Sequence, residues 1–301
     1  MAAKRKRMAG TGPTEKTNPL SRRIDLASSL NIAEIINRED QKIALAVRSR
    51  LKEIARAIDL AYEKIYRGGR FFYVGAGTSG RLGVLDAAEC PPTFGVSPSV
   101  IQGIIAGGKR ALWRSAEGAE DDSRAGANAL RQAGADANDV VCGISASGKT
   151  PFVRGALTEA KRRKAGRILI ACHPEPELGP LADVVINPVI GPEVIAGSTR
   201  MKAGTATKMV LNMISTGVMI RLGKVYGNLM VDVNPASKKL KNRSERIIAA
   251  VLHCSEGRAR NLLRLSRNQT KVAIIMGAKG CSVQEAQRLF QEKRGLLRKI
   301  L

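Results

Sequence analysis

The sequence is short of the side chains on which several common chemistries depend. It has two histidines, His173 and His253, and its five cysteines are scattered without a CxxC pair. A His/Cys zinc site or a histidine-based catalytic triad therefore has little material to work with. The odd, scattered set of cysteines gives no disulfide framework and is typical of a reducing cytosol.

Long apolar runs and aromatic residues are also scarce. No stretch approaches the roughly 20 apolar residues of a membrane-spanning helix, and no apolar region follows the basic start Met1–Arg7 as it would in a secretory signal. We therefore expect a cytoplasmic protein. Aromatic residues make up 3% of the chain, so its core must be built mainly from Ala, Val, Ile and Leu.

Positive charge is in excess, with a net charge of +24 in 301 residues. Residues 1–23 contribute +6 and residues 237–301 contribute +12, which leaves +6 for the 213 residues between them. Such ends could associate weakly with polyanions. The basic tail contains one aromatic residue, Phe290, and so lacks the stacking side chains of nucleic-acid-binding modules. We therefore interpret the basic ends as a solvated surface and not as a site for a nucleic-acid partner.

The two ends of the chain differ from its middle. Polar residues with Gly and Pro predict a flexible basic arm over residues 1–20. Apolar positions at helical spacing predict one long amphipathic helix from about Asp40 to Tyr66. A second long helix is expected from near Thr199. Short basic helical segments after a boundary near Pro235 predict a small all-α domain over residues 235–301.

Between these ends, short β-like runs alternate with helical patterns. The runs are Arg70–Val74, Val100–Ala106, Val140–Ser145, Ile168–Cys172 and Val184–Asn187, and the helical segments include Leu82–Ala88, Ser123–Ala133 and Phe152–Ala165. This alternation predicts an α/β fold over residues 21–234, with a doubly wound parallel sheet covered by helices on both faces. Ligands of such folds bind at the carboxyl ends of the strands.

The first turn that indicates chemistry is Gly75–Arg81, which directly follows the first strand. Its GxGxxG pattern alone is weak evidence for a dinucleotide site. No acidic residue for ribose recognition stands at the end of a clear second strand, whereas Thr78 and Ser79 offer hydroxyls to anionic oxygens. Phosphate binding is therefore the better interpretation.

The second turn, Ser145-Ala-Ser-Gly-Lys-Thr150, joins the third predicted strand to a helix. It places Ser145, Ser147, Lys149 and Thr150 beside helix N-terminal amides, which favour bound anions. These hydroxyls could instead be ordinary helix caps. Two such turns on different strands of one sheet favour a phosphate site.

A third element, Gly191–Lys202, leads into the helix expected from Thr199. It carries Ser198, Thr199, Arg200 and Lys202, an unusual density of hydroxyls and positive charge for a helix start. Contacts with the substrate are expected from Ser198, Thr199 and Lys202.

The pair of turns resembles the sugar isomerase (SIS) domain of phosphosugar isomerases and regulators. That resemblance implies that the Ser-x-Ser-Gly-x-Thr turn holds a sugar phosphate. Longer stretches resemble the N-acetylmuramic acid 6-phosphate etherase family, and they are Gly75–Gly95, Ala116–Asp122, Gly191–Thr205 and Gly227–Val233, with Thr14-Glu15, Asn18 and Ile36–Asp40 near the start. The resemblance covers nearly the whole chain from about residue 14. The basic first residues and the His173–Glu177 loop depart from it.

The resemblance implies a carbon–oxygen lyase of peptidoglycan recycling. It would cleave the D-lactyl ether of N-acetylmuramate 6-phosphate with water, giving N-acetylglucosamine 6-phosphate and D-lactate, without a cofactor or metal and as a homodimer. Matching the motif positions makes Glu89 the acid on the lactyl oxygen and Glu120 the base at C2. Glu117 is the second choice for the base. Two carboxyl groups suffice for this acid–base work.

Two other functions share the same phosphate site. One is a non-catalytic sugar-phosphate sensor like the animal glucokinase regulatory protein, which is much larger and has two SIS-type units. The other is a phosphosugar aldose–ketose isomerase, which would not need the long motif around Glu89. The presence of both Glu89 and Glu120 favours the etherase.

Overall fold

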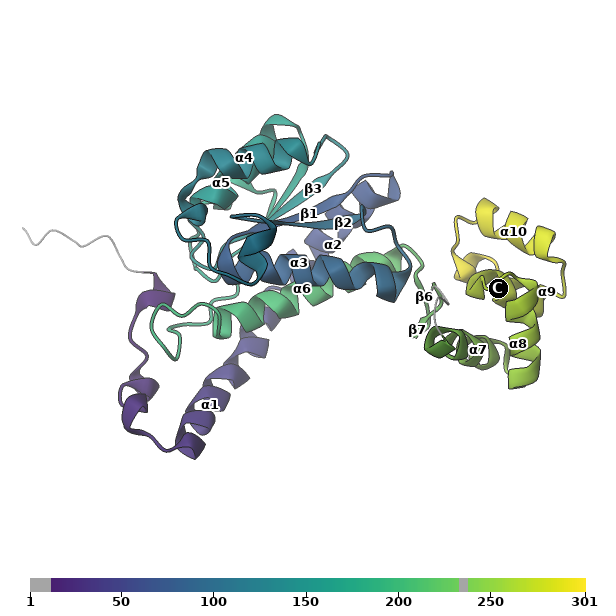
Figure 1. The fold of residues 1–301 in the computed structure, drawn as a ribbon, viewed down its shortest axis with the longest axis horizontal. Helices are drawn as coiled ribbons and strands as arrows, with labels where there is room; N and C mark the ends of the chain where they lie inside the picture. Colours follow the sequence, from purple (N-terminus) through teal and green to yellow (C-terminus); the bar gives the residue numbers. More distant parts are fainter. Residues whose placement is uncertain (1–11, 233–237) are drawn as a thin grey trace, which may run out of the picture. The chain divides into compact units, whose positions relative to one another are not determined.

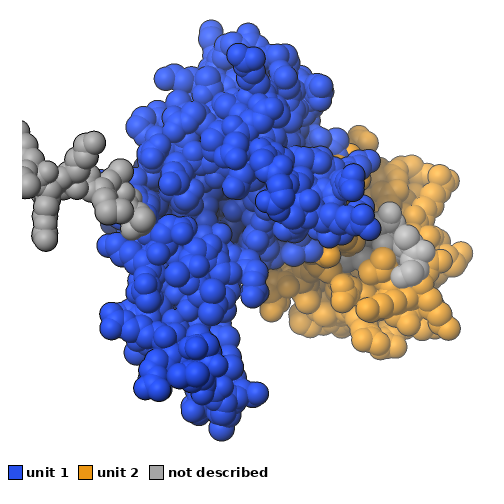
Figure 2. Space-filling model, turned by 60° about the vertical axis from the view of Figure 1, so that its left-hand side comes forward, with its two compact units in different colours: residues 1–87, 99–214 blue, residues 88–98, 215–301 orange. Residues whose placement is uncertain are grey.

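The computed structural model describes residues 12–232 and 238–301. The chain divides into two compact units, shown in Figure 2: unit 1 is Met1–Ala87 with Ser99–Ile214, and unit 2 is Ala88–Pro98 with Ser215–Leu301. Helices α3 (Gly77–Phe94) and α6 (Lys202–Arg221) contribute residues to both units. The domain boundary predicted near Pro235 lies outside the described residues.

Unit 1 is built on a five-stranded sheet in which every neighbouring pair of strands is parallel. The strands are β1 (Phe71–Gly75), β2 (Ile101–Ile105), β3 (Val140–Ile144), β4 (Gly166–Ile170) and β5 (Val184–Ile186), in the spatial order β2-β1-β3-β4-β5. Burial of β1 and β3 along their whole length explains their continuous apolar sequence. The predicted α/β fold with a parallel sheet is confirmed.

Helices cover both faces of this sheet (Figure 1). They are α2 (Leu51–Tyr66), α4 (Ser123–Gln132) and α5 (Pro151–Arg162), together with α3. Successive strand residues point to opposite faces. Gly83 of α3 approaches Tyr73, on one face, and Leu157 of α5 approaches Gly143, on the other. This layering is that of a doubly wound sheet.

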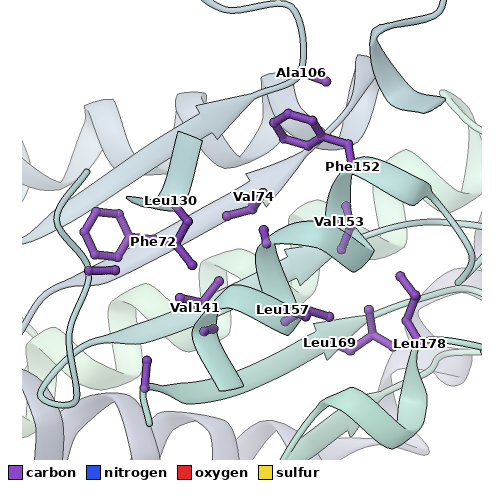
Figure 3. Close-up of a cluster of buried hydrophobic side chains, with 14 of the residues drawn as sticks. Phe72, Val74, Ala106, Leu130, Val141, Phe152, Val153, Leu157, Leu169 and Leu178 are labelled. Carbon is purple, nitrogen blue, oxygen red and sulfur yellow. The ribbon is translucent and has the colours of Figure 1, made fainter. Parts of the chain in front are cut away.

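A hydrophobic core of unit 1 lies between the sheet and the layer of α4 and α5 (Figure 3). Strands supply Phe72, Val74 and Val141, and α5 supplies Val153 and Leu157. Most of its other members are alanine or leucine, as the scarcity of aromatic residues predicts. Tight aliphatic packing of this kind fixes the strand ends that carry the two turns.

The single helix predicted from Asp40 to Tyr66 is wrong. The structure has two helices, α1 (Ser29–Arg48) and α2, separated at Ser49 and Arg50. The Ser49 hydroxyl donates to the Ala46 carbonyl at 2.7 Å, and its backbone N–H donates to Leu45. A serine that bonds the preceding turn in this way competes with continuation of the helix.

Residues 12–20, predicted as part of a flexible arm, are instead held within unit 1. They include two 3-10 helices, η1 (Pro13–Glu15) and η2 (Pro19–Ser21), with Thr14 and Asn18 buried. Asn18 donates to the Pro192 carbonyl at 3.3 Å, and the Thr14 carbonyl accepts from Gly197 at 2.9 Å. These long-range bonds hold the segment; residues 1–11 lie outside the described part of the chain.

Unit 2 combines a short hairpin with a helical core. Its elements are β6 (Val225–Tyr226), β7 (Leu229–Met230), α7 (Lys238–Leu252), α8 (Glu256–Leu265), α9 (Thr270–Lys279) and α10 (Val283–Glu292). The buried Lys271 ammonium and Lys224 both contact Asp232, each at 2.8 Å, which ties the segment after the hairpin to α9. The helical character of the tail agrees with the sequence pattern, whereas the hairpin was not predicted.

We expect Gly80→Ala to destabilise unit 1, because α3 passes too close to the sheet for a side chain. An added Cβ would lie 2.6 Å from the Gly75 carbonyl oxygen and 2.6 Å from a side-chain carbon of Ile105. Overpacking of this kind costs about 1–3 kcal/mol, measurable by urea denaturation. Gly179→Ala is the control, since its nearest new contact is at 3.8 Å. Equal stability of the two variants would contradict the prediction.

Candidate functional site

The first two predicted turns leave adjacent strands at the same edge of the sheet. Gly75, the last residue of β1, pairs with Ile144, the last residue of β3, and with Ile105 of β2 on its other side. The chain runs from β1 to β2 and then returns to β3 across β1, so this edge is the point where the strand order reverses. Ligands of open α/β sheets bind in the crevice at such a point.

The second turn is organised by its own hydroxyl groups. Ser145, 1% exposed, shares a 2.8 Å hydrogen bond with the Thr150 hydroxyl and accepts from the Thr150 N–H at 3.3 Å. Gly148 has a φ of +71°, which favours glycine. Ser145 and Thr150 thus shape the turn, while the half-buried Ser147 and the exposed Lys149 face outward from the core.

The first turn places half-buried Thr78 and Ser79 in the opening turn of α3. The third element lies beside it, because a Cβ added at Gly204 of α6 would meet the Thr78 methyl group at 3.5 Å. Ser198 and Thr199 are half-buried in the turn that precedes α6. The structure therefore brings the starts of α3 and α6 together, with hydroxyls on both.

The start of α6 is fixed by buried charges. Both carboxylate oxygens of Glu193 accept backbone N–H groups, from Lys202 and Ala203, each at 2.9 Å. Burial raises the pKa of Glu193, although these two bonds favour its charged form. The Lys202 ammonium, 1% exposed, donates to Glu39 at 2.5 Å and to the Ile190 carbonyl at 2.9 Å. A substrate would reach this ammonium only if the Glu39 contact opened.

Glu120 lies on η5 (Ala119–Asp121) and lines a hollow of about 120 Å³. Gly77, Arg81 and Glu117 line the same hollow. Glu117 accepts a hydrogen bond from the Ser115 hydroxyl at 2.6 Å, whereas Glu120 has no partner among the described residues. Of the two candidate bases, Glu120 is therefore the one whose carboxylate is available.

Glu89 is exposed on α3, about three turns beyond Thr78. It belongs to unit 2, whereas Glu120 belongs to unit 1. The buried Asp86, one turn before Glu89, accepts from the Tyr73 hydroxyl at 2.9 Å and from Lys208 at 2.7 Å. The only signal of this cluster in the sequence is an acidic residue within an apolar helical segment.

Metal and membrane features are absent from the described ranges, 12–232 and 238–301. No three His, Cys, Asp or Glu side chains come together there as a metal site. No helix within those ranges combines the length and apolarity needed to cross a bilayer. The turns and the hollow at the sheet edge present hydroxyls, backbone amides, carboxylates and a few cations.

Known proteins resemble the chain along almost all of its length. The profile of the glucokinase regulatory protein N-terminal SIS domain matches residues 53–161. The N-acetylmuramic acid 6-phosphate etherases of Lactobacillus acidophilus and Edwardsiella ictaluri are each 48% identical to this chain over 288 residues. These alignments cover 96% of this chain, 97% of the Lactobacillus protein and 96% of the Edwardsiella protein. The Photorhabdus laumondii etherase is 46% identical over 285 residues, 95% of each chain. Identity at this level over the whole length shows that the chain belongs to the N-acetylmuramic acid 6-phosphate etherase family.

Proposed function

We propose that the protein cleaves the D-lactyl ether of N-acetylmuramate 6-phosphate with water, giving N-acetylglucosamine 6-phosphate and D-lactate. The names of its relatives support this activity, and so does the arrangement of the strand ends. The observation that carries the proposal is the unpaired Glu120 carboxylate, in a hollow that Gly77 of the first turn also lines. The reaction would belong to amino-sugar recycling from the cell wall, in the cytoplasm.

Breaking this ether requires an activated neighbouring position, since an alkoxide is a poor leaving group. Opening of the sugar ring exposes the C1 aldehyde, which acidifies the proton on C2. Glu120 removes that proton, Glu89 protonates the lactyl oxygen on C3, and the C3–O bond breaks. Water then adds to C3 of the unsaturated aldehyde, a proton returns to C2, and the ring closes. The protein thus acts as a carbon–oxygen lyase through two carboxyl groups.

We assign the sugar phosphate to the two turns. Thr78 and Ser79 present hydroxyls at the start of α3, and the second turn presents the Ser147 hydroxyl and the Lys149 ammonium. Backbone N–H groups at the start of a helix favour a dianion, and hydroxyls supply further hydrogen bonds. Thr150 and Ser145 keep the second turn in shape through their mutual bond.

A homodimer is part of the proposal. The edge strand β2 borders an apolar groove of about 530 Å³, whose lining includes Ile104, Leu112, Phe152 and the 75%-exposed Trp113. Apolar side chains exposed beside an open sheet edge favour burial against another chain. A monomer by light scattering at working concentration would remove this part of the proposal.

The activity is tested by incubating the protein with N-acetylmuramate 6-phosphate in ¹⁸O-labelled water. We expect D-lactate and N-acetylglucosamine 6-phosphate in equal amounts, with the label on the C3 oxygen of the sugar. Label in the lactate instead would show cleavage on the lactyl side and contradict the mechanism. Binding of the sugar phosphate without release of lactate would favour the non-catalytic sensor. The matched profile is named after a regulatory protein of that kind.

A further inference from the structure

The hollow that contains Glu120 also contains an arginine whose position is fixed. Arg81 lies in the second turn of α3, and its Nε–H donates to the carbonyl oxygens of Ala111 and Leu112, each at 3.0 Å. These carbonyls belong to η4 (Lys109–Leu112), on the side of the sheet where β2 ends. The guanidinium is thus held at the wall of the hollow, which Ala111 also lines.

The outer end of this guanidinium is available to a ligand. Arg81 forms no ion pair with the described residues, and its two terminal nitrogens have no protein partner among them. These nitrogens are not buried without a partner in the protein interior, and the Arg81 side chain is half-buried. Arg81 is the one cation among the described residues that line the hollow, where Glu117 and Glu120 are the acidic ones.

The chemistry of the proposed substrate supplies an anion for this position. N-acetylmuramate 6-phosphate carries two anionic groups, the phosphate on C6 and the lactyl carboxylate on the C3 oxygen. The base acts at C2, next to C3, so a substrate placed for proton removal by Glu120 brings its lactyl group to the same hollow. Its phosphate leaves the opposite side of the sugar ring.

Two cations, Lys149 and Arg81, lie at separate positions along this edge of the sheet. The second turn, with Lys149, follows β3, whereas the η4 carbonyls that anchor Arg81 follow β2. β2 and β3 lie on opposite sides of β1, about two strand spacings or ~10 Å apart. The position beside Lys149 therefore suits the phosphate, and the position beside Arg81 suits the lactyl carboxylate.

We propose that Arg81 binds the lactyl carboxylate and so selects muramate over other amino-sugar phosphates. This inference rests on the proposed function. The two terminal nitrogens of a guanidinium can donate parallel N–H bonds to the two oxygens of a carboxylate. Because Nε is already bonded to the η4 carbonyls, the side chain loses little further conformational freedom when it binds. The carboxylate belongs to the lactyl group before and after the C3–O bond breaks. Arg81 can therefore keep its contact with it during this step.

The test compares Arg81→Gln and Arg81→Lys with the wild-type chain. Charge-assisted bonds of this kind predict a roughly 10- to 150-fold rise in KM and Kd for N-acetylmuramate 6-phosphate in Arg81→Gln. Lysine should restore part of the loss, as a charge without the planar fork. The Kd of N-acetylglucosamine 6-phosphate, which lacks the lactyl group, should change less than about threefold. We expect D-lactate to inhibit the wild-type chain and not the Arg81→Gln variant. Arg110→Gln, an exposed neighbour on η4, is the matched control and should change nothing.

The substrate-selective loss is the outcome that a purely structural Arg81 would not give. An equal fall in affinity for both sugar phosphates, or no fall for either, would overturn the proposal. Circular dichroism checks the fold, and Arg81→Lys decides the question if Arg81→Gln does not fold. If the wild type binds N-acetylmuramate 6-phosphate but releases no lactate, the proposed activity fails, while the two affinities still test Arg81.

Discussion

Glu120→Gln should lose both lactate release and exchange of the C2 proton with solvent, whereas Glu89→Gln should lose lactate release alone. The base is needed for any carbanion at C2, but the acid is needed only when the C3–O bond breaks. Each loss should be at least about 10²- to 10⁴-fold, the range for a positioned acid or base. Glutamine keeps the shape of the side chain and removes its ability to transfer a proton.

Both reactions are followed on the same sample. Incubation in D₂O reports exchange at C2 by NMR, and an enzymatic assay reports D-lactate. Glu117→Gln is the matched control, because Glu117 lines the same hollow but is hydrogen-bonded to Ser115. If Glu117→Gln removed C2 exchange and Glu120→Gln did not, the assignment of the base would be reversed.

Much of unit 1 could be predicted from the sequence because its signals are local. β1 and β3 are short, continuously apolar and followed by turns that contain glycine, so each run can be recognised without reference to its neighbours. The first run illustrates this, since its apolar pattern ends at Val74, one residue before β1 ends at Gly75. The sheet edge follows from the rule that parallel strands share a carboxyl end. The neighbouring turns at that edge were therefore predictable.

Other features depend on partners distant in sequence and could not be predicted. Lys202 looked like a substrate contact because hydroxyls and a second cation surround it in the sequence. The contact of its ammonium with Glu39, 163 residues away, does not follow from that pattern. The Asp86–Lys208 contact spans 122 residues. The choice between Glu117 and Glu120 depends on the conformation of a loop, because only the folded loop shows which carboxylate Ser115 binds.

Lys202→Met should therefore destabilise unit 1 strongly, by about 3–5 kcal/mol, because it leaves Glu39 buried without its main partner. The Glu39 side chain is 3% exposed and the Lys202 side chain 1%. Hydrogen exchange of the β1–β5 amides measures the free energy of unfolding of this unit. Lys42→Met is the matched control: Lys42 contacts the same carboxylate but is 56% exposed, so its loss should cost less than about 1 kcal/mol. Equal losses would contradict the buried-pair interpretation.

The dependence on pH gives an independent check of the same pair. Burial raises the pKa of Glu39, but the hydrogen bonds from Lys202 and Lys42 outweigh it and hold the pKa at about 2, below the ordinary 4.5. The pair's contribution to stability is therefore complete above about pH 4.5 and is lost as pH falls toward 2. In Lys202→Met, burial dominates and the pKa should lie above 4.5, so the carboxyl is neutralised at mildly acidic pH. The stability difference between wild type and variant should then shrink between pH 7 and pH 4. A constant difference would show that Lys202 stabilises unit 1 through packing of its aliphatic stem and not through its charge.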